Sequence, residues 1–485
     1  MAKLNLDPNK FVLESVSIWK VGEDFGKPYA NLMEYMISFQ YFEDILSPSI
    51  SGILVIHDSG ENLPSTMPIQ GFERVSIVVK DYKDTKHQYD FRVWKVSNRV
   101  EIDSRKQGYA LGLISEKALI NEGVKVNKVL SGPVNVVVKK LLTEYLNVGE
   151  VSIESQETIN AVKIIPASKS PFAVIRDLQQ KAIAKTSTKT KSQVKPNLSK
   201  ISSGSGAKVI SKSDYDNQAA TAKGTAGYFF FETRDGFKFK SIDTLSSADP
   251  SKFGGSAPVA TYYYKPALIE KTSIQNNRKI QEVVFRNELD IMKKMREGTF
   301  SSVCAFFNIN TGKYEEYLYK LSDMWDNMAH LGSQTQLPYG QKQLSQYPTR
   351  RLSTIINHEN WYNGTGIASN DANDSGGSKS QYPDYQKQFL SQSIARAGIL
   401  FNQTLLITVA GNLDLRVGDK IEVMIPNTGP SKKKDKLGSF DPEHSGIYLI
   451  KKINHQFLKT DSTVNSVLEL VRDSYGILDG ESNTK

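Results

Sequence analysis

The first 120 residues of the chain contain a series of short segments in which apolar and polar residues alternate. Alternation with a period of two is the pattern of a strand with one buried face, and β-branched and aromatic residues dominate these segments. Turn-forming residues, such as Asp58-Ser59-Gly60, separate them. The expected strands are Glu34–Phe42, Ser51–His57, Arg74–Lys80, Tyr89–Val96 and Tyr109–Ile114. This succession restricts the N-terminal part of the chain to a β-barrel or a β-sandwich.

After about Gly123 the spacing of apolar residues becomes helical. One helix is expected after Pro133, with Gly149 as its expected end. A second is expected after Ser170-Pro171, because serine is a good N-cap and proline fits the first helical turn. The apolar positions are Val134, Val137, Val138, Leu141, Leu142 and Tyr145 in the first helix, and Phe172, Ile175, Leu178 and Ile183 in the second. We therefore expect an α/β region to follow the N-terminal strands.

The positive charge of the chain is concentrated in two segments. The formal net charge is +9, but residues 184–213 contain seven lysines and no acid, and residues 432–436 contain four lysines and one aspartate. These two segments together have a net charge of +10, so the remaining residues have a net charge of −1. Residues 184–225 are mostly Ser, Lys, Thr, Gly and Ala, too polar to offset the entropy of ordering, so a mobile loop is expected. Residues 184–213 contain no aromatic residue that would stack on bases, which favours a solvated loop that orders against a neighbouring protein over nucleic-acid binding.

The remaining strands fall into groups on either side of a long irregular segment. An Asp235-Gly236 turn predicts a hairpin between Tyr228–Thr233 and Phe237–Ser241. Residues 327–385 are too long for an ordinary connection and form an excursion that contacts something or stays mobile. The other expected elements are strands at Ile280–Leu289 and Ser301–Asn308, a helix at Gln386–Phe401, and strands at Thr404–Val409, Lys420–Ile425, Ser445–Gln456 and Ser466–Val471.

The last group of strands carries motifs that resemble a known family. Ala410–Ile421, Ser445–His455 and Val467–Arg472 resemble the closing barrel of tail hub proteins, which include the hubs of T-even phages, the late control D protein of other contractile phages, and type VI secretion spikes. Ser168–Arg176 and Gly227–Phe239 look like the helix and the hairpin that these hubs place between their barrels. The resemblance thus extends over most of the chain.

These motifs also have a physical interpretation of their own. Gly418-Asp419 makes a turn between strands, Gly446 frees the backbone where a strand begins, and Tyr448, Ile450 and Ile453 alternate as in a half-buried strand. Near the N-terminus, Ser51–Ser59 resembles the first barrel of the T-even hub and of tail-tube subunits. Residues 184–225 and 327–385 match no part of the family, so their roles stay open.

The resemblance implies a mainly β (α+β) chain with two tail-tube-like antiparallel β-barrels, an inserted α/β region and long loops. Three copies would form a homotrimer with a pseudo-sixfold ring, and the α/β region would lie outside it. The first barrel is expected to run from Leu4 to about Glu122, and the second to combine about Leu268–Leu321 with Thr404–Val471. The expected division is 1–122 for the first barrel, 123–264 for the inserted region, 265–326 for strands of the second barrel, 327–400 for the excursion and helix, 401–476 for the C-terminal strands, and 477–485 for a tail.

The function that the resemblance implies is that of a baseplate hub in a contractile phage tail. The trimer would join the hexameric tail tube to the trimeric central spike and form part of the DNA channel, with DNA passing through the lumen without specific binding. The implied partners are a central spike protein that can carry a lysozyme domain, the tail tube or a tube-initiator protein, baseplate wedge proteins and the tape measure protein. The protein would be located in the virion, in the tail baseplate.

The residues themselves give no reason to expect catalysis, a cofactor or a metal. The six histidines are dispersed and form no His-Glu-x-x-His pair, and His455 is expected to be a structural histidine at a strand end. Cys304 has no identifiable base and is expected to be a core residue. Asp371, Asn373, Ser375 and Gly376 fit the opening of a calcium loop, but Tyr382 occupies the position where a bidentate glutamate is required, so a polar flexible loop is the better interpretation. Gly364-x-Gly366 has no preceding strand and fits turn composition better than a phosphate loop.

Two other functions remain open. A receptor-binding or glycan-binding tail protein would use the aromatic side chains of the excursion, Tyr347, Trp361, Tyr362, Tyr382 and Tyr385, as platforms for sugars. A spike-associated cell-wall hydrolase would need two placed carboxylates, and with 52 acidic residues the sequence cannot single out a pair. The N-terminus shows no signal-peptide pattern and no run approaches the ~18 apolar residues of a membrane span, so we expect a soluble protein made in the host cytoplasm, without membrane contact.

Overall fold

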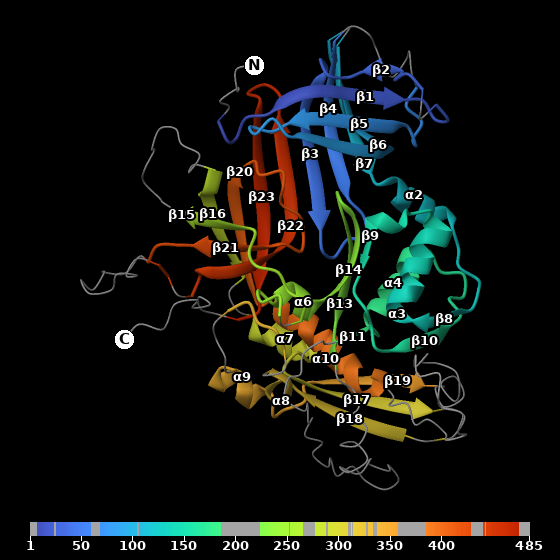
Figure 1. The fold of residues 1–485 in the computed structure, drawn as a ribbon, viewed down its shortest axis with the longest axis vertical. Coiled ribbons are helices and arrows are strands. Elements are labelled where there is room, and N and C mark those ends of the chain that lie inside the picture. Colours follow the sequence, from blue (N-terminus) through green and yellow to red (C-terminus); the bar gives the residue numbers. More distant parts are fainter. Residues whose placement is uncertain are drawn as a thin grey trace.

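The computed structural model describes residues 7–23, 26–59, 68–103, 106–185, 224–251, 253–264, 277–287, 290–308, 312, 314–325, 328–332, 337–356, 385–427, 440–441 and 443–474. Strands make up 47% and helices 21% of the structure, so the fold is mainly β, as predicted. Figure 1 shows a large sheet at the top and centre, a helical region beside it, and a smaller α/β unit below. Among the described residues, no helix is both long and apolar enough to cross a membrane.

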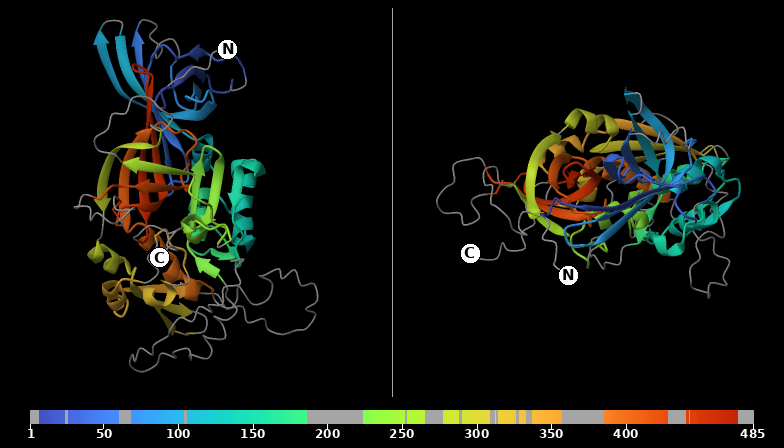
Figure 2. Two further views of the ribbon diagram at one scale, coloured as in Figure 1. Left: turned by 60° about the vertical axis from the view of Figure 1, so that its left-hand side comes forward. Right: turned by 90° about the horizontal axis from the view of Figure 1, so that it is seen from above.

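The N-terminal part of the large sheet is a curved antiparallel sheet. Its strands are β1 (Val12–Trp19), β2 (Ala30–Asn31), β3 (Met36–Asp44), β4 (Ser51–Ser59), β5 (Arg74–Lys80), β6 (Lys86–Asp103) and β7 (Lys106–Ile114). They pair in the order β2-β1-β5-β6-β7-β4-β3. Their inward positions alternate along each strand, so that Phe39, Leu54, Ile77 and Phe91 meet in one apolar core. The ends of β4, β6 and β7 extend beyond the rest of the molecule (Figure 2, left).

The C-terminal strands form a closed, mixed barrel of six strands. These strands are β15 (Ala260–Tyr264), β16 (Lys279–Asn287), β20 (Gln403–Ala410), β21 (Lys420–Met424), β22 (Gly446–Leu458) and β23 (Thr463–Arg472). The barrel closes because β22 pairs with both β21 and β23. The prediction of antiparallel strands fails at β15, which runs parallel to both of its neighbours.

The β22–β23 hairpin belongs to both halves of the sheet. Near its base it completes the closed barrel, and towards its tip β22 pairs with β3 of the N-terminal sheet, with Phe457 opposite Phe39. On its other side the tip meets the segment before β1, since the amide of Phe11 donates to the carbonyl of Ser462 and the amide of Val464 to that of Asn9. One hairpin therefore connects the two edges of the N-terminal sheet and fuses that sheet with the closed barrel.

The middle region packs beside the large sheet. Its elements are α2 (Glu116–Gly123), β8 (Leu130–Pro133), α3 (Val134–Lys140), β9 (Ile153–Ser155), β10 (Ala161–Ile164), α4 (Pro171–Gln179), β11 (Ile183–Lys185), β12 (Gly224–Ala226), β13 (Tyr228–Thr233), β14 (Gly236–Ser241) and α6 (Ile242–Ser246). All six residues of β13 are buried, because Tyr228 and Phe230 face the core of the middle region while Phe229 and Phe231 face the core of the barrel. The hairpin β13–β14 is therefore inserted between two hydrophobic cores.

The two helices predicted for the middle region are present as α3 and α4, with changes at their ends. α3 begins after Pro133 and continues as one π-helical turn, Leu141–Tyr145, and the chain then turns at Asn147, whose φ is 51°, rather than at the predicted Gly149. α4 begins at Pro171 as predicted, but it ends at Gln179. Ile183, which the sequence pattern placed in that helix, lies in β11. Strand β11 pairs with β12, so the ends of the lysine-rich segment lie together, while residues 186–223 lie outside the described part.

A separate α/β unit lies at the bottom of Figure 1. It contains α7 (Ile291–Glu297), β17 (Ser301–Asn308), β18 (Tyr314–Lys320), α8 (Leu321–Met324), α9 (Tyr339–Leu344), β19 (Arg350–Ile356) and α10 (Tyr385–Leu400). The prediction that Ser301–Asn308 contributes to the second barrel is wrong, because this strand forms a three-stranded sheet in the order β18-β17-β19. The alternation of apolar and polar residues predicted this strand correctly, but the same alternation occurs in any sheet with one face covered by a helix. Here α10 provides that cover, with Ser391 against Cys304.

Candidate functional site

The turn of the β13–β14 hairpin is the place where the middle region meets both halves of the large sheet (Figure 1). It presents charged residues that bind partners on β3, on the β3–β4 connection and on the β20–β21 loop. We call this cluster the joint and define it as Glu43, Glu232, Arg234, Asp235 and Arg416. Its members come from three distant parts of the sequence, so the joint exists only in the folded chain.

The carboxylate of Glu43 fixes three segments in one place. Its Oε1 accepts hydrogen bonds from the hydroxyl of Tyr41 at 2.7 Å and from the amide of Arg234 at 2.9 Å, and its Oε2 accepts one from the amide of Val417 at 2.9 Å. Burial raises the pKa of Glu43, and the three donors act in the opposite direction. Because its acceptor capacity is used by the protein itself, this carboxylate acts as a cross-link rather than as a reactive group.

Glu232 makes a second buried contact between β13 and the N-terminal sheet. It accepts a hydrogen bond from the amide of Ile50 at 3.1 Å and one from the hydroxyl of Ser115 at 2.8 Å. Burial raises the pKa of Glu232 to about 7, and the negative charge of Glu43 adds to this effect. The carboxyl group therefore changes its charge near neutral pH within the contact between two parts of the fold.

The raised pKa of Glu232 predicts that stability falls as the pH rises. The folded state binds the proton more tightly than the unfolded state, whose pKa is near 4.5, so the stabilisation is complete below pH 4.5 and is lost as the pH rises to about 7. The cost at high pH is on the order of 3 kcal/mol. We expect Glu232→Gln to flatten the dependence of urea-unfolding midpoints on pH between these limits. The exposed Glu101→Gln is the matched control, and an unchanged slope in Glu232→Gln would contradict this assignment.

Arg416 ties the hairpin turn to the barrel. Its Nε and Nη2 donate to the two carboxylate oxygens of Asp235 at 2.9 and 3.2 Å, and its Nη1 donates to the carbonyls of Leu413 and Leu415. A bidentate pair of this kind is stronger and more directional than a single contact. The predicted turn at Gly418 follows directly, with φ of 89°, and an added Cβ there would lie 2.9 Å from the ring of Phe231.

One group of described side chains has the geometry of a metal site. Asp81, His87 and Asp414 offer ligand atoms within 4.8 Å of one another. However, Lys83 already donates to Asp414 at 2.8 Å, and Arg234 donates to Nδ1 of His87 at 2.9 Å. A metal-bound histidine normally donates its other N–H to an acceptor, whereas here that nitrogen accepts from a cation. The partners present therefore do not fit a metal ion, and the two acids are balanced by Lys83 and Arg234.

A second charged cluster connects the barrel with the lower α/β unit. We call it the Arg396 network and define it as Arg396, Asp243, Asp473 and His330. Arg396 on α10 is fully buried and lies 3.0 Å from Asp473 and 3.3 Å from Asp243. His330 Nδ1 lies 2.8 Å from Asp473, and its Nε2 lies 2.9 Å from the carbonyl of Trp325.

The Arg396 network also holds the segment before residue 333. The two aspartates accept backbone amides of that segment, Ala329 for Asp243 and Leu331 for Asp473. Burial alone would raise the pKa of Asp473, but His330 and Arg396 together keep it well below its usual range. This part of the predicted excursion is therefore fixed against the barrel. Residues 357–384 lie outside the described part.

The outer face of the N-terminal sheet carries large apolar side chains that nothing described covers. Trp94 is 54% exposed, Ile53 40% and Leu458 43%, and they lie on strands β6, β4 and β22. An added Cβ at Gly112 would lie 3.0 Å from Nε1 of Trp94, so the indole lies against β7 at this glycine. We call Trp94, Ile53 and Leu458 the outer patch. Exposed aromatic and aliphatic residues that lie together on one face are typical of protein interfaces.

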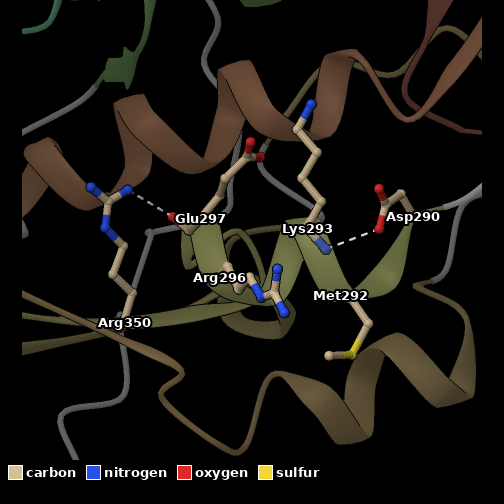
Figure 3. Close-up of a pocket in the computed structure, with 6 residues that line it drawn as sticks. All are labelled: Asp290, Met292, Lys293, Arg296, Glu297 and Arg350. Carbon is tan, nitrogen blue, oxygen red and sulfur yellow. Dashed lines mark hydrogen bonds between the residues drawn. The ribbon is translucent and has the colours of Figure 1, made fainter.

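A shallow hollow lies on the lower unit (Figure 3). Its volume is about 510 Å³, and it is lined by Asp290, Met292, Lys293, Arg296, Glu297 and Arg350. Asp290 caps helix α7 by accepting the amide of Lys293 at 2.9 Å, and Arg350 donates to the carbonyl of Glu297 at 3.1 Å. The side chains of Lys293 and Met292 point away from each other (Figure 3). Without converging polar groups, the hollow has no arrangement that would orient a small ligand.

The residues discussed in the sequence fall into two groups. Cys304 is buried as predicted, and His455 is buried with Nδ1 2.8 Å from the hydroxyl of Ser466, as expected for a structural histidine. The candidates Gly364, Gly366, Asp371, Asn373, Ser375, Gly376 and Tyr382, the aromatic residues Trp361 and Tyr362, His358, and Lys432, Lys433, Lys434 and Lys436 lie outside the described residues. Of the proposed sugar platforms, Tyr347 is exposed and Tyr385 lies in the first turn of α10.

The alternating pattern of β3 contains a local signal for the joint. In the alternating segment of β3, Phe39, Tyr41 and Glu43 occupy successive inward positions, so the acid falls in the row of core residues. Glu232 and Asp243 are likewise buried acids within apolar segments. A charge at a core position indicates a partner elsewhere in the chain.

No model of a known protein family matches the sequence, and no curated protein does. Several solved structures are similar. A tail protein from Neisseria meningitidis is 13% identical, with 96% of this chain and 97% of that chain covered and a TM-score of 0.46. A 43 kDa tail protein of prophage MuSo2 from Shewanella oneidensis is 9% identical, with coverages of 95% and 99% and a TM-score of 0.46. A component of the type VI secretion system from E. coli is 8% identical, with coverages of 96% and 78% and a TM-score of 0.38.

Proposed function

We propose that this chain is a structural subunit of a contractile phage tail, the baseplate hub, and that it works as a symmetry adaptor without catalysis. The observation that carries the proposal is the continuous sheet in which one chain fuses a curved N-terminal sheet with a closed barrel through the β22–β23 hairpin. Three such chains would place six barrel-like units around one axis. A ring of this kind could contact a hexameric tube on one side and a trimeric spike on the other.

Rigid connection of the two units is what an adaptor requires, and the structure has two devices for it. The hairpin shares its backbone hydrogen bonds between both units, and the joint adds buried charged contacts from the middle region. A flexible link would let the two units change their relative angle, and six units would then not close into one ring. The proposed partners are the central spike, the tail tube or tube initiator, wedge proteins and the tape measure protein, in a virion tail with DNA in the lumen.

We propose that the outer patch contributes to contacts between copies of the chain. Light scattering of the purified protein should then give three times the chain mass of 54.2 kDa. The double variant Trp94→Lys with Ile53→Lys should reduce that mass to one chain, because two buried ammonium groups would have to be desolvated in the interface. Val151→Lys, which replaces a fully exposed apolar residue of the middle region, is the matched control and should leave the trimer intact.

The two parts of this proposal can fail separately. A wild-type protein that stays a monomer at high concentration would refute the ring. A trimer that persists in the double variant would keep the ring but place its contacts elsewhere. Electron micrographs of the trimer, viewed along its axis, should show six similar densities around a central channel, and three well-separated lobes would contradict symmetry matching.

A further inference from the structure

The side chain of Arg234 reaches from the hairpin turn to a histidine of the N-terminal sheet. Its Nη1 lies 2.9 Å from Nδ1 of His87 and 3.4 Å from the hydroxyl of Tyr89. A guanidinium group can only donate hydrogen bonds, so Nδ1 of His87 must be the acceptor and carry no proton. On the other side of the ring, Nε2 lies 3.3 Å from Oδ2 of Asp81 and donates to it. The contact therefore requires one specific tautomer of the neutral ring.

The surroundings of His87 favour that neutral ring. Burial lowers its pKa, and the positive charge of Arg234 lowers it further, whereas Asp81 and Asp414 raise it. The ring and Asp81 are both almost completely buried. The charged and titratable groups that face His87 from the elements packed around it are Asp81 and Lys83 from the β5–β6 turn, Tyr89 from β6, Arg234 from the hairpin turn, Asp414 and Arg416 from the β20–β21 loop, and His455 from β22.

A second proton on His87 would turn its Nδ1 from an acceptor into a donor, so the hydrogen bond from Arg234 could no longer form. Nδ1 would then carry a hydrogen directed at the guanidinium group, so two donors and two positive charges would lie 2.9 Å apart without an acceptor. His87 is held in a strand of the sheet, whereas Arg234 belongs to a turn between two strands. The turn is therefore the part that can move.

We propose that the contact between His87 and Arg234 is an acid-sensitive latch, which holds the β13–β14 turn against the N-terminal sheet and releases it when His87 becomes doubly protonated. The consequence is a change in how the middle region is attached to the sheet. This inference does not depend on the ring or on any partner, because both residues of the latch, His87 and Arg234, lie in one chain.

Release is expected to remain local. The hairpin keeps contacts outside the N-terminal sheet, namely the pair of Asp235 with Arg416 and the burial of β13 on both faces. Hydrogen exchange in the turn should therefore increase while the strands stay protected. A general acid unfolding would instead expose distant segments, such as β17 in the lower unit.

The test is hydrogen-exchange mass spectrometry on the full chain at about pH 7.5 and about pH 4, because the pKa of His87 is lowered from that of an ordinary histidine. Exchange rates in peptides covering residues 228–241 are corrected for the effect of pH on the chemical exchange step. We expect several-fold faster corrected exchange in the turn at the lower pH. His87→Asn should abolish the change, because its Oδ1 can accept from Arg234 and does not titrate.

Two further variants make the result decisive. Arg234→Met should show fast exchange in the turn at both pH values, because the latch is open throughout. His444→Asn, which alters another histidine with an aspartate partner, is the control and should respond to pH as the wild type does. Equal corrected rates in the wild type at both pH values would refute the latch. So would an acid response that persists in His87→Asn, or one that appears equally in β17.

Discussion

Replacing Arg396 by methionine should lower the free energy of unfolding by about 3–5 kcal/mol, the range found when one partner of a buried ion pair is removed. Methionine replaces the aliphatic part of the arginine side chain but carries no charge, so Asp243 and Asp473 would stay buried without their shared cation. The loss should also loosen the segment that contains Ala329 and Leu331, whose amides bind the same two carboxylates. Urea unfolding followed by circular dichroism measures the effect.

The control for this prediction is another helical arginine with no such environment. Arg176 on α4 is exposed, and Arg176→Met should change stability by no more than about 0.5 kcal/mol. The double variant Asp243→Asn with Asp473→Asn, placed in the Arg396→Met background, should recover part of the loss because it removes the two unpaired charges. If Arg396→Met were as stable as the wild type, the network would contribute nothing to the attachment of the lower unit.

Gly236→Ala should destabilise the hairpin by about 1–3 kcal/mol from backbone strain alone, with a steric cost in addition. Gly236 has φ of 123°, a region that alanine rarely adopts, and an added Cβ would lie 2.2 Å from the carbonyl oxygen of Ser152. Ser152 directly precedes β9, which pairs with β14, so the clash would push the two strands apart. Thermal unfolding of the purified variant should show a lower midpoint than that of the wild type.

Gly132→Ala separates strain from contact in this prediction. Gly132 has φ of 129°, close to that of Gly236, but an added Cβ there meets no atom within 4 Å. It should therefore show the strain alone, and the difference between the two variants is the cost of the clash with Ser152. Equal losses of stability in both variants would mean that β9 and β14 can move apart without a measurable loss of stability.

Local patterns in the sequence were enough to predict most of the elements. Arg74–Lys80 and Ser301–Asn308 were predicted with the bounds that the structure has, because a period of two combined with flanking polar residues defines a strand and its ends. The hairpin turn at Asp235-Gly236 was predicted because only glycine adopts its backbone conformation readily. Strand β1 was missed, since it is interrupted by a bulge between Leu13 and Ser15 that breaks the alternation.

Relations between elements could not be obtained in the same way. Alternation in Ser301–Asn308 shows that one face is buried but not which sheet receives the strand, and the structure places it outside the barrel. The same applies to β22, which is long enough to serve two sheets, although its sequence shows only one continuous strand. Pairing depends on complementarity between segments that are distant in sequence, and no local window contains that information.

For the candidate site, the sequence indicated what is present but not how it is combined. His87, Arg234 and Arg416 are unremarkable as single residues, and their roles arise because strand β6, the β13–β14 turn and the β20–β21 loop meet in the folded chain. The position of Glu43 among inward residues of β3 was the one local signal of a buried charge. Its partners, the amides of Arg234 and Val417, carry no signature in their side chains, because the bonds come from the backbone.

The shared hairpin has a consequence for how the chain is made. The N-terminal sheet is synthesised first, but the strand that pairs with its edge at β3, and the backbone that meets Asn9 and Phe11, come from the other end of the sequence. During translation the edge of β3 therefore stays unpaired until almost the whole chain has left the ribosome. Until then the aromatic ring of Phe39 lacks its partner Phe457. Contacts of such long range make folding slow and leave an open strand edge exposed meanwhile. Chains cut short before β22 should therefore accumulate as aggregates rather than as a folded N-terminal unit.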